Sequence, residues 1–112
     1  MNKSVTVLGE TYTIETRNAD RDKFLERADG YTDRSTHTIV LAEMDGHVTL
    51  DNKERYQAEV LRHEIVHAFV AECGIQNLTD YGPGDDDEGV VDWFARMGPK
   101  IAAAWQAAGC ME

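Results

Sequence analysis

The sequence has few cysteines, few basic residues and no long apolar run. Two cysteines, Cys73 and Cys110, cannot build a disulfide framework, and neither belongs to a CxxC pair, which excludes a structural zinc knuckle. We expect Cys73 to be a small buried side chain near a helix end and Cys110 to be an exposed thiol. Lys and Arg number 11 against 21 Asp and Glu, a net charge of −10. This balance argues against binding to nucleic acid or to an anionic membrane, because both attract basic proteins.

No apolar segment approaches the roughly 20 residues that a membrane-spanning helix requires. The first five residues lead into a strand pattern and lack the apolar centre of a signal peptide, so the expected location is the cytoplasm. A length of 112 residues corresponds to one small domain, and we expect residues 1–112 to fold as a single compact unit.

Runs of β-branched residues predict strands at 5–8, 12–16 and 36–42. The first two runs flank Gly9 and therefore predict a hairpin. Residues 21–28 predict a short helix in which Phe24 and Leu25 point inward. The polar segment 31–35 is expected to connect this helix to the third strand.

Apolar residues then recur at helical spacing up to Cys73. Asp51 or Asn52 can cap the start of this helix, and Gly74 can end it. A second helix begins near the acidic run at 85–87 and stops at Gly98 and Pro99, and a final helix covers 100–108. The predicted fold is α+β: a sheet of three or four strands packs on the long helix, and two C-terminal helices follow.

The long helix contains an HExxH segment, His63-Glu64-Ile65-Val66-His67. Two histidines four residues apart lie on one face of a helix, so both imidazoles can bind the same Zn²⁺. Glu64 then lies beside the metal and can act as a general base on water. The alternative interpretation is a solvated helix face that has this sequence by chance.

A catalytic zinc ion usually has three protein ligands and one open position. The third ligand should come from a later element, where Glu88 and the neighbouring acidic residues are candidates. We select Glu88 because Asp92 follows on the same helix face and can accept a hydrogen bond from a ligand histidine. Either acid, taken alone, could instead be a solvated helix residue, as we expect for the run at 85–87.

The HExxH segment followed by Glu88 and Asp92 resembles the gluzincin clan of zinc metallopeptidases, and the short chain resembles the minigluzincins and small phage and bacterial proteins. The likeness covers residues 55–100. It departs from the clan's second element, Asn-Glu-xx-Ser-Asp, at Asp87 and Val91. It implies that His63, His67 and Glu88 bind one zinc ion, with Asp92 supporting a histidine.

The resemblance also implies features around the metal. Peptide substrate would add to an exposed edge strand, expected at 36–42. A second electrophile over the oxyanion would be Tyr81, with His37 and His47 as alternatives. Terminal segments hold minigluzincins latent, so the C-terminal tail, through Cys110 or the terminal carboxylate, could inhibit the enzyme.

The predicted function is therefore a zinc-dependent endopeptidase that hydrolyses peptide bonds with a metal-activated water. A peptidase that cleaves a repressor would share this chemistry and differ in substrate. Two other classes stay open: a zinc-binding protein without catalysis, and an acidic phage or bacterial interaction protein whose charge meets a basic partner.

Overall fold

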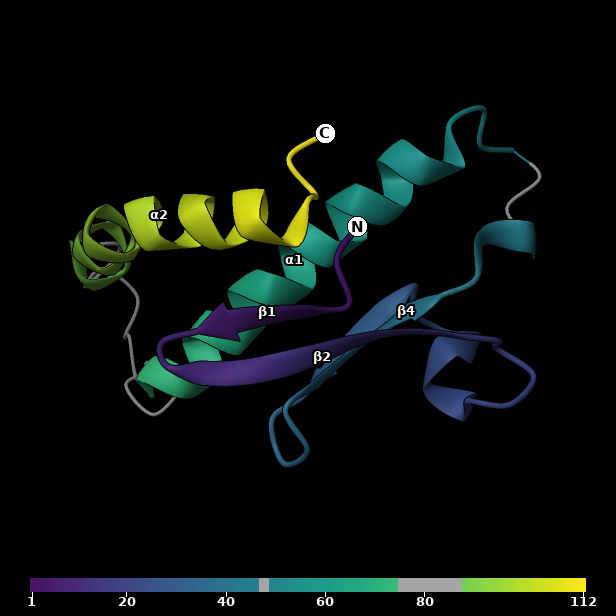
Figure 1. Cartoon of the computed structure of the whole chain (residues 1–112), viewed down its shortest axis with the longest axis horizontal. Helices are drawn as coiled ribbons and strands as arrows, with labels where there is room; N and C mark the ends of the chain where they lie inside the picture. Colours follow the sequence, from purple (N-terminus) through teal and green to yellow (C-terminus); the bar gives the residue numbers. More distant parts are fainter. Residues whose placement is uncertain (47–48, 75–87) are drawn as a thin grey trace.

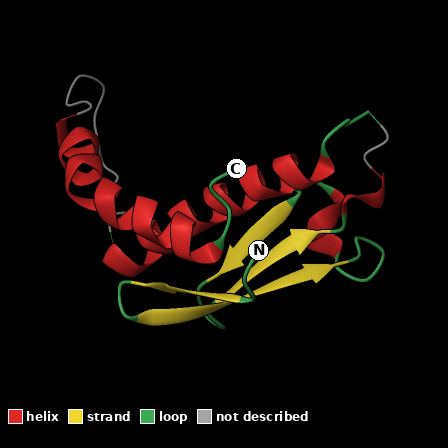
Figure 2. Cartoon of the chain, turned by 45° about the horizontal axis from the view of Figure 1, so that its top comes forward, coloured by secondary structure: helices red, strands yellow, loops and turns green. Residues whose placement is uncertain are grey.

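The structure is a computed structural model that describes residues 1–46, 49–74 and 88–112, without the side chains of Glu88 and Asp92. Two layers make up the fold: a sheet, and two long helices that lie on one of its faces (Figures 1 and 2). This arrangement confirms the α+β class and the packing of the sheet on the HExxH helix.

The sheet has four strands in the order β1-β2-β4-β3. β1 and β2 form the predicted antiparallel hairpin, β2 runs parallel to β4, and β4 runs antiparallel to β3. Leu8 and Gly9 make the hairpin turn with φ of 49° and 89°. The strand bounds are Ser4–Val7 for β1, Glu10–Arg17 for β2, Gly30–Asp33 for β3 and Thr38–Ala42 for β4.

The predicted edge strand is an interior strand. β4 lies between β2 and β3, and its side chains are buried on both faces of the sheet. Ile39 and Leu41 belong to the core beneath the helices, whereas Val40 and Ala42 pack on the opposite face. The segment expected to be a connection supplies β3, and within the described residues β3 and β1 are the two edge strands of the sheet. The prediction was wrong because the unbroken apolar run at 39–42 is typical of an interior strand, and because the partners of a strand come from distant segments.

A short 3-10 helix, η1 (Lys23–Glu26), replaces the helix predicted at 21–28, and a second one, η2, covers Met44–Gly46. The Asp22 side chain caps η1 by accepting a hydrogen bond from the Phe24 amide. Leu25 is buried as expected, but Phe24 is 74% exposed. A single turn of helix can direct only one of two adjacent side chains toward the sheet, so the inward position predicted for Phe24 was wrong.

Helix α1 (Lys53–Cys73) begins and ends as the sequence predicted. The Asn52 side chain accepts a hydrogen bond from the Arg55 amide at 3.0 Å, and Gly74 ends the helix in the left-handed region with φ of 74°. The HExxH segment therefore lies in the middle of a capped helix. The face of α1 that packs on the sheet carries Ala58, Leu61, Ile65, Ala68 and Phe69, all of them buried.

Helix α2 (Glu88–Ala108) contains both predicted C-terminal helices as its two arms. Figure 1 shows the arms running in different directions. Pro99 lies inside the helix, and since proline has no backbone N–H, the helix can change direction there without breaking. The second arm packs on α1 and β1 through Ile101, Ala104 and Ala108.

The N-terminus is held against the end of α2. The Asn2 amide donates a hydrogen bond to the Ala108 carbonyl at 2.9 Å, so the two ends of the described chain lie side by side (Figure 1). Within the described residues, no helix has both the length and the apolar character needed to cross a bilayer.

Candidate metal centre

His63 and His67 present their Nε2 atoms to a common point on the exposed side of α1. The two nitrogens are 3.0 Å apart, and the ring centroids are 4.7 Å apart. Two nitrogens that share a tetrahedral zinc at about 2.0–2.1 Å lie roughly 3.3 Å apart, so the pair fits one ion. Without a shared ion, a contact this short requires that one imidazole donates a hydrogen bond to the other.

Glu64 is buried, unlike an ordinary surface glutamate. It is 6% exposed, and within the described part of the chain it is the one charged residue that is buried. The Thr32 hydroxyl lies 2.9 Å from Glu64 Oε1 and 3.0 Å from the Glu64 carbonyl oxygen, so it can donate to either. Burial of a carboxylate is costly unless the group has polar partners, and such groups concentrate at functional sites.

The histidines and Glu64 share a cavity of about 410 Å³ between α1 and the edge strand β3. It is lined by Gly30, Tyr31, Thr32, Arg34, His63, Glu64, His67 and Ala71. The cavity therefore combines two imidazoles, a buried carboxylate and a strand edge that is unpaired within the described residues. Imidazoles are common metal ligands, and a carboxylate beside them can accept a proton.

Sequence reasoning missed Gly30 and Thr32 of β3 and Arg34 of the following turn, all of which line this cavity. A Cβ added to Gly30 would lie 2.9 Å from the Val40 carbonyl oxygen and 3.5 Å from Glu64 Cγ, so the missing side chain lets β3 approach α1. Gly30 and Thr32 lie on one face of β3 because side chains alternate along a strand, but the polar composition of 31–35 predicts a connection and not a strand.

Glu88 and Asp92 are four residues apart near the start of α2, and their side chains lie outside the described residues. The start of α2 lies against the end of α1, because Trp93 Nε1 donates to Cys73 Sγ at 3.0 Å. Cys73 is half-buried at this contact. No group of three or more His, Cys, Asp or Glu side chains that could hold a metal occurs within the ranges that the structure describes. The roles of Glu88 and Asp92 stay predictions.

Of the candidate electrophiles, Tyr81 and His47 lie outside the described residues. His37 lies in the turn between β3 and β4 and lines a neighbouring cavity of about 840 Å³. Its Nε2 is 3.5 Å from Glu72 Oε2, and its ring packs against Tyr12 with centroids 5.0 Å apart. His37 does not line the cavity of His63 and His67, so the structure does not bring it to the metal-binding pair.

Cys110 is fully buried, so the expectation of an exposed thiol was wrong. Its carbonyl accepts a hydrogen bond from Arg62 Nη1 at 2.7 Å, and burial raises the pKa of the thiol. The predicted exposure rested on its place near the chain end, but the tail folds back over α1.

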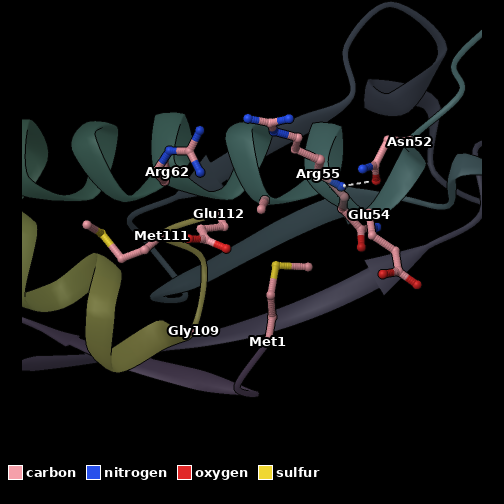
Figure 3. A pocket seen from close by; sticks show the side chains of 10 residues that line it. Met1, Asn52, Glu54, Arg55, Arg62, Gly109, Met111 and Glu112 are labelled. Carbon is pink, nitrogen blue, oxygen red and sulfur yellow. Dashed lines mark hydrogen bonds between the residues drawn. The ribbon is translucent and has the colours of Figure 1, made fainter.

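Met111 and Glu112 line a cavity of about 880 Å³ together with Met1, Arg55 and Arg62 (Figure 3). This cavity shares no lining residue with the one that contains the HExxH side chains. Self-inhibition would therefore require the tail to leave the position described here, and it stays a prediction.

Comparisons with protein-family models, with curated proteins and with solved structures find no match to this chain.

Proposed function

We propose that this protein is a zinc-dependent endopeptidase. One observation carries the proposal: two imidazole nitrogens 3.0 Å apart and a buried carboxylate line the same cavity beside an open strand edge. A solvated helix face does not account for the burial of Glu64 or for its contact with Thr32. The resemblance to gluzincins adds the expectation that Glu88 completes the ligand set.

His63, His67 and Glu88 would hold the zinc ion, and Asp92 would orient one of the histidines. When bound, zinc polarises the scissile carbonyl and lowers the pKa of water toward neutrality. Glu64 takes a proton from the attacking water and returns it to the leaving amine. Thr32 holds the Glu64 carboxylate by the 2.9 Å contact, and the burial of this acid keeps competing water away from it.

An extended substrate would pair with β3, whose second edge is unpaired within the described residues. We also propose a cytoplasmic location. Cys73 and Cys110 are both free thiols, which a reducing compartment preserves.

The test is zinc analysis combined with peptide hydrolysis. Purified protein should bind one zinc ion, and His63→Ala should lose it. Glu64→Gln should retain zinc and lose about 100- to 10,000-fold in kcat, because the general base is removed while both histidines remain. Full hydrolysis by Glu64→Gln would disprove the mechanism. Stoichiometric zinc without hydrolysis would favour the non-catalytic zinc protein, and absence of stoichiometric zinc would favour the acidic interaction protein.

A further inference from the structure

Three residues line both the cavity of His63 and His67 and its neighbour, namely Tyr31, Thr32 and Arg34, and Arg34 is the one among them with a charged side chain. It lines both the 410 Å³ cavity of His63, Glu64 and His67 and the 840 Å³ cavity that contains Phe24. We propose that Arg34 binds a carboxylate of the peptide that lies along β3, and so makes the enzyme selective for acidic substrates. The inference rests on the proposed peptidase function and specifies its substrate class.

The cavity lining places Arg34 on the side of the sheet that faces α1. Side chains alternate along a strand, and in β3 the Gly30 position and Thr32 both face α1. Arg34 lies in the turn directly after β3 and lines the same cavity as His67 and Ala71, toward the C-terminal end of α1. A peptide that pairs with β3 would therefore bring one of its α1-facing side chains to the Arg34 guanidinium group, next to the side chain that lies at Glu64.

Within the part of the chain that the structure describes, the Arg34 guanidinium acts on Tyr12 through its charge and is not held by a hydrogen bond or an ion pair. The Arg34 side chain is exposed. Arg17, in contrast, is bonded to Glu15 and Asp22, and Arg62 donates to the Cys110 carbonyl. A guanidinium group free to form two parallel bonds is the preferred protein partner of a carboxylate.

The neighbouring cavity suits the next residue of the same peptide. Tyr31 and Phe24 lie on its wall with ring centroids 5.3 Å apart, and Phe24 is 74% exposed. Hydrogen bonds to Asp22 and Arg17 hold the Tyr31 hydroxyl in place. Because an extended peptide also alternates its side chains, an acidic residue opposite Arg34 would have an apolar neighbour against Phe24 and Tyr31.

The selectivity has to be local, because the chain as a whole carries a charge of −10 and repels anionic peptides at long range. Charge-assisted bonds that remain partly exposed to water are weaker than buried ones. We therefore expect a preference of about tenfold for Glu over Gln at the position that contacts Arg34.

The experiment uses zinc-loaded full-length protein and labelled peptides with amidated C-termini. Each peptide carries either Glu or Gln, moved stepwise along an otherwise neutral, apolar-rich sequence. Wild-type protein should show the tenfold preference in kcat/KM at one position. Arg34→Gln should lose the preference, so that its kcat/KM values for the Glu and Gln peptides become equal. Arg55→Gln, which makes the same charge change beside the separate 880 Å³ cavity, should retain the preference.

A second arm compares free and amidated C-termini on peptides without acidic side chains. A preference for the free terminus that disappears in Arg34→Gln would show that Arg34 binds the C-terminal carboxylate of the peptide. If wild type prefers Glu over Gln but does not distinguish free from amidated termini, Arg34 binds a side-chain carboxylate. Equal cleavage of Glu and Gln peptides, and of free and amidated ones, by wild type would overturn the inference and leave the peptidase function standing. A preference that persists in Arg34→Gln would overturn it as well.

Binding to Glu64→Gln protein, measured by fluorescence anisotropy, separates the two claims. Tighter binding of the Glu peptide that depends on Arg34, without hydrolysis by wild type, supports the inference and refutes the proposed function. Peptides that neither bind nor are cleaved refute both. A fall in the melting temperature of Arg34→Gln with equal loss for all peptides would assign Arg34 a structural role instead.

Discussion

Glu64 combines two properties that are seldom found together in a charged residue: its side chain is buried, and it still lines a cavity. The buried position follows from helical spacing, since Leu61, Ile65 and Ala68 around it pack against the sheet. His63 and His67 point to the exposed side of the same helix turn. One turn of α1 therefore supplies both the proposed metal ligands and the proposed proton acceptor, and Thr32 contacts the acceptor from a different element.

Thr32 is a positioning residue for Glu64. Thr32→Val keeps the side-chain shape and removes the hydroxyl, so we expect kcat/KM to fall about tenfold, the loss that corresponds to one hydrogen bond of about 1.4 kcal/mol. Zinc content should not change. Thr32→Ser should restore most of the activity, because it returns the hydroxyl alone. Equal losses in the Val and Ser variants would show that packing and not the hydrogen bond matters.

Tyr12 makes the stability of the protein sensitive to alkaline pH. Its side chain is fully buried and donates a hydrogen bond to Glu72 Oε2 at 2.6 Å. Burial, followed by the bond to Glu72, raises the pKa of Tyr12 well above its usual value. The unfolded chain therefore ionises at about pH 10 while the folded chain does not, and stability falls as the pH rises further.

Tyr12→Phe tests this linkage. At neutral pH the free energy of unfolding of the variant should be about 1 kcal/mol lower than that of wild type, because the hydrogen bond to Glu72 is removed. Above about pH 10 the wild-type free energy of unfolding should fall more steeply than that of the variant, by up to about 1.4 kcal/mol per pH unit. Denaturant unfolding at several pH values measures both slopes. Tyr31 and Tyr56 also have raised pKa values and contribute equally to both proteins. Identical slopes would contradict the assignment to Tyr12.

At the scale of elements, the contact between β3 and α1 creates the candidate centre. Gly30 allows this contact, because a Cβ there would lie 2.9 Å from both the Val40 carbonyl oxygen and Val60 Cγ1. The carbonyl belongs to the β4 backbone and cannot move without disturbing the β3–β4 pairing. Any larger residue must push the edge strand, and Thr32 with it, away from Glu64.

Gly30→Ala should therefore destabilise the protein by about 1–3 kcal/mol, the range typical of overpacking, and lower peptidase activity through displacement of Thr32. Denaturant unfolding measures the first effect. Gly98→Ala is the matched control, because beyond its chain neighbours a Cβ there has Phe94 ring atoms at 3.6 Å and 3.8 Å as its nearest contacts. Alanine is favoured over glycine within a helix but is disfavoured directly before Pro99, so the control should lose less stability than Gly30→Ala. Similar losses in both variants would refute the argument from close approach.

At the scale of the whole molecule, the proposed zinc ion would join α1 to α2. In the described residues, the end of α1 meets the start of α2 through the contact of Cys73 with Trp93. The second arm of α2 packs against α1 in the core. A ligand from each helix would add a constraint that depends on metal. Since the domain is small, one bound ion represents a considerable share of its stability.

Zinc should consequently raise the melting temperature. At a free zinc concentration of about 100 Kd, linkage predicts a gain of about 2.7 kcal/mol, which corresponds to roughly 10 °C for a domain of this size. Differential scanning fluorimetry with buffered zinc measures the shift. Mg²⁺ should have no effect, because two imidazoles suit zinc and not a hard cation. His67→Ala should melt at the same temperature with and without zinc. A zinc shift retained in His67→Ala would place the ion elsewhere.

The sequence by itself determined the features that depend on neighbours within a few residues. The Asn52 cap, the Gly74 end and the His63–His67 spacing could all be predicted, because helical periodicity and capping act over one turn. The same reasoning predicted the β1–β2 hairpin, whose turn is local. The four consecutive apolar residues at 39–42 also marked an interior strand buried on both faces, a signal that the edge assignment overlooked.

Only the tertiary structure decided which strand forms the open edge, which hydroxyl meets Glu64 and where the tail lies. Thr32 and Glu64 are 32 residues apart, and Arg62 meets Cys110 across 48. Such contacts depend on the order in which strands pair and helices pack, and many chain paths share the same local pattern. The physical reason is that packing selects among these paths by the total apolar surface they bury, a property of the complete fold and not of any segment.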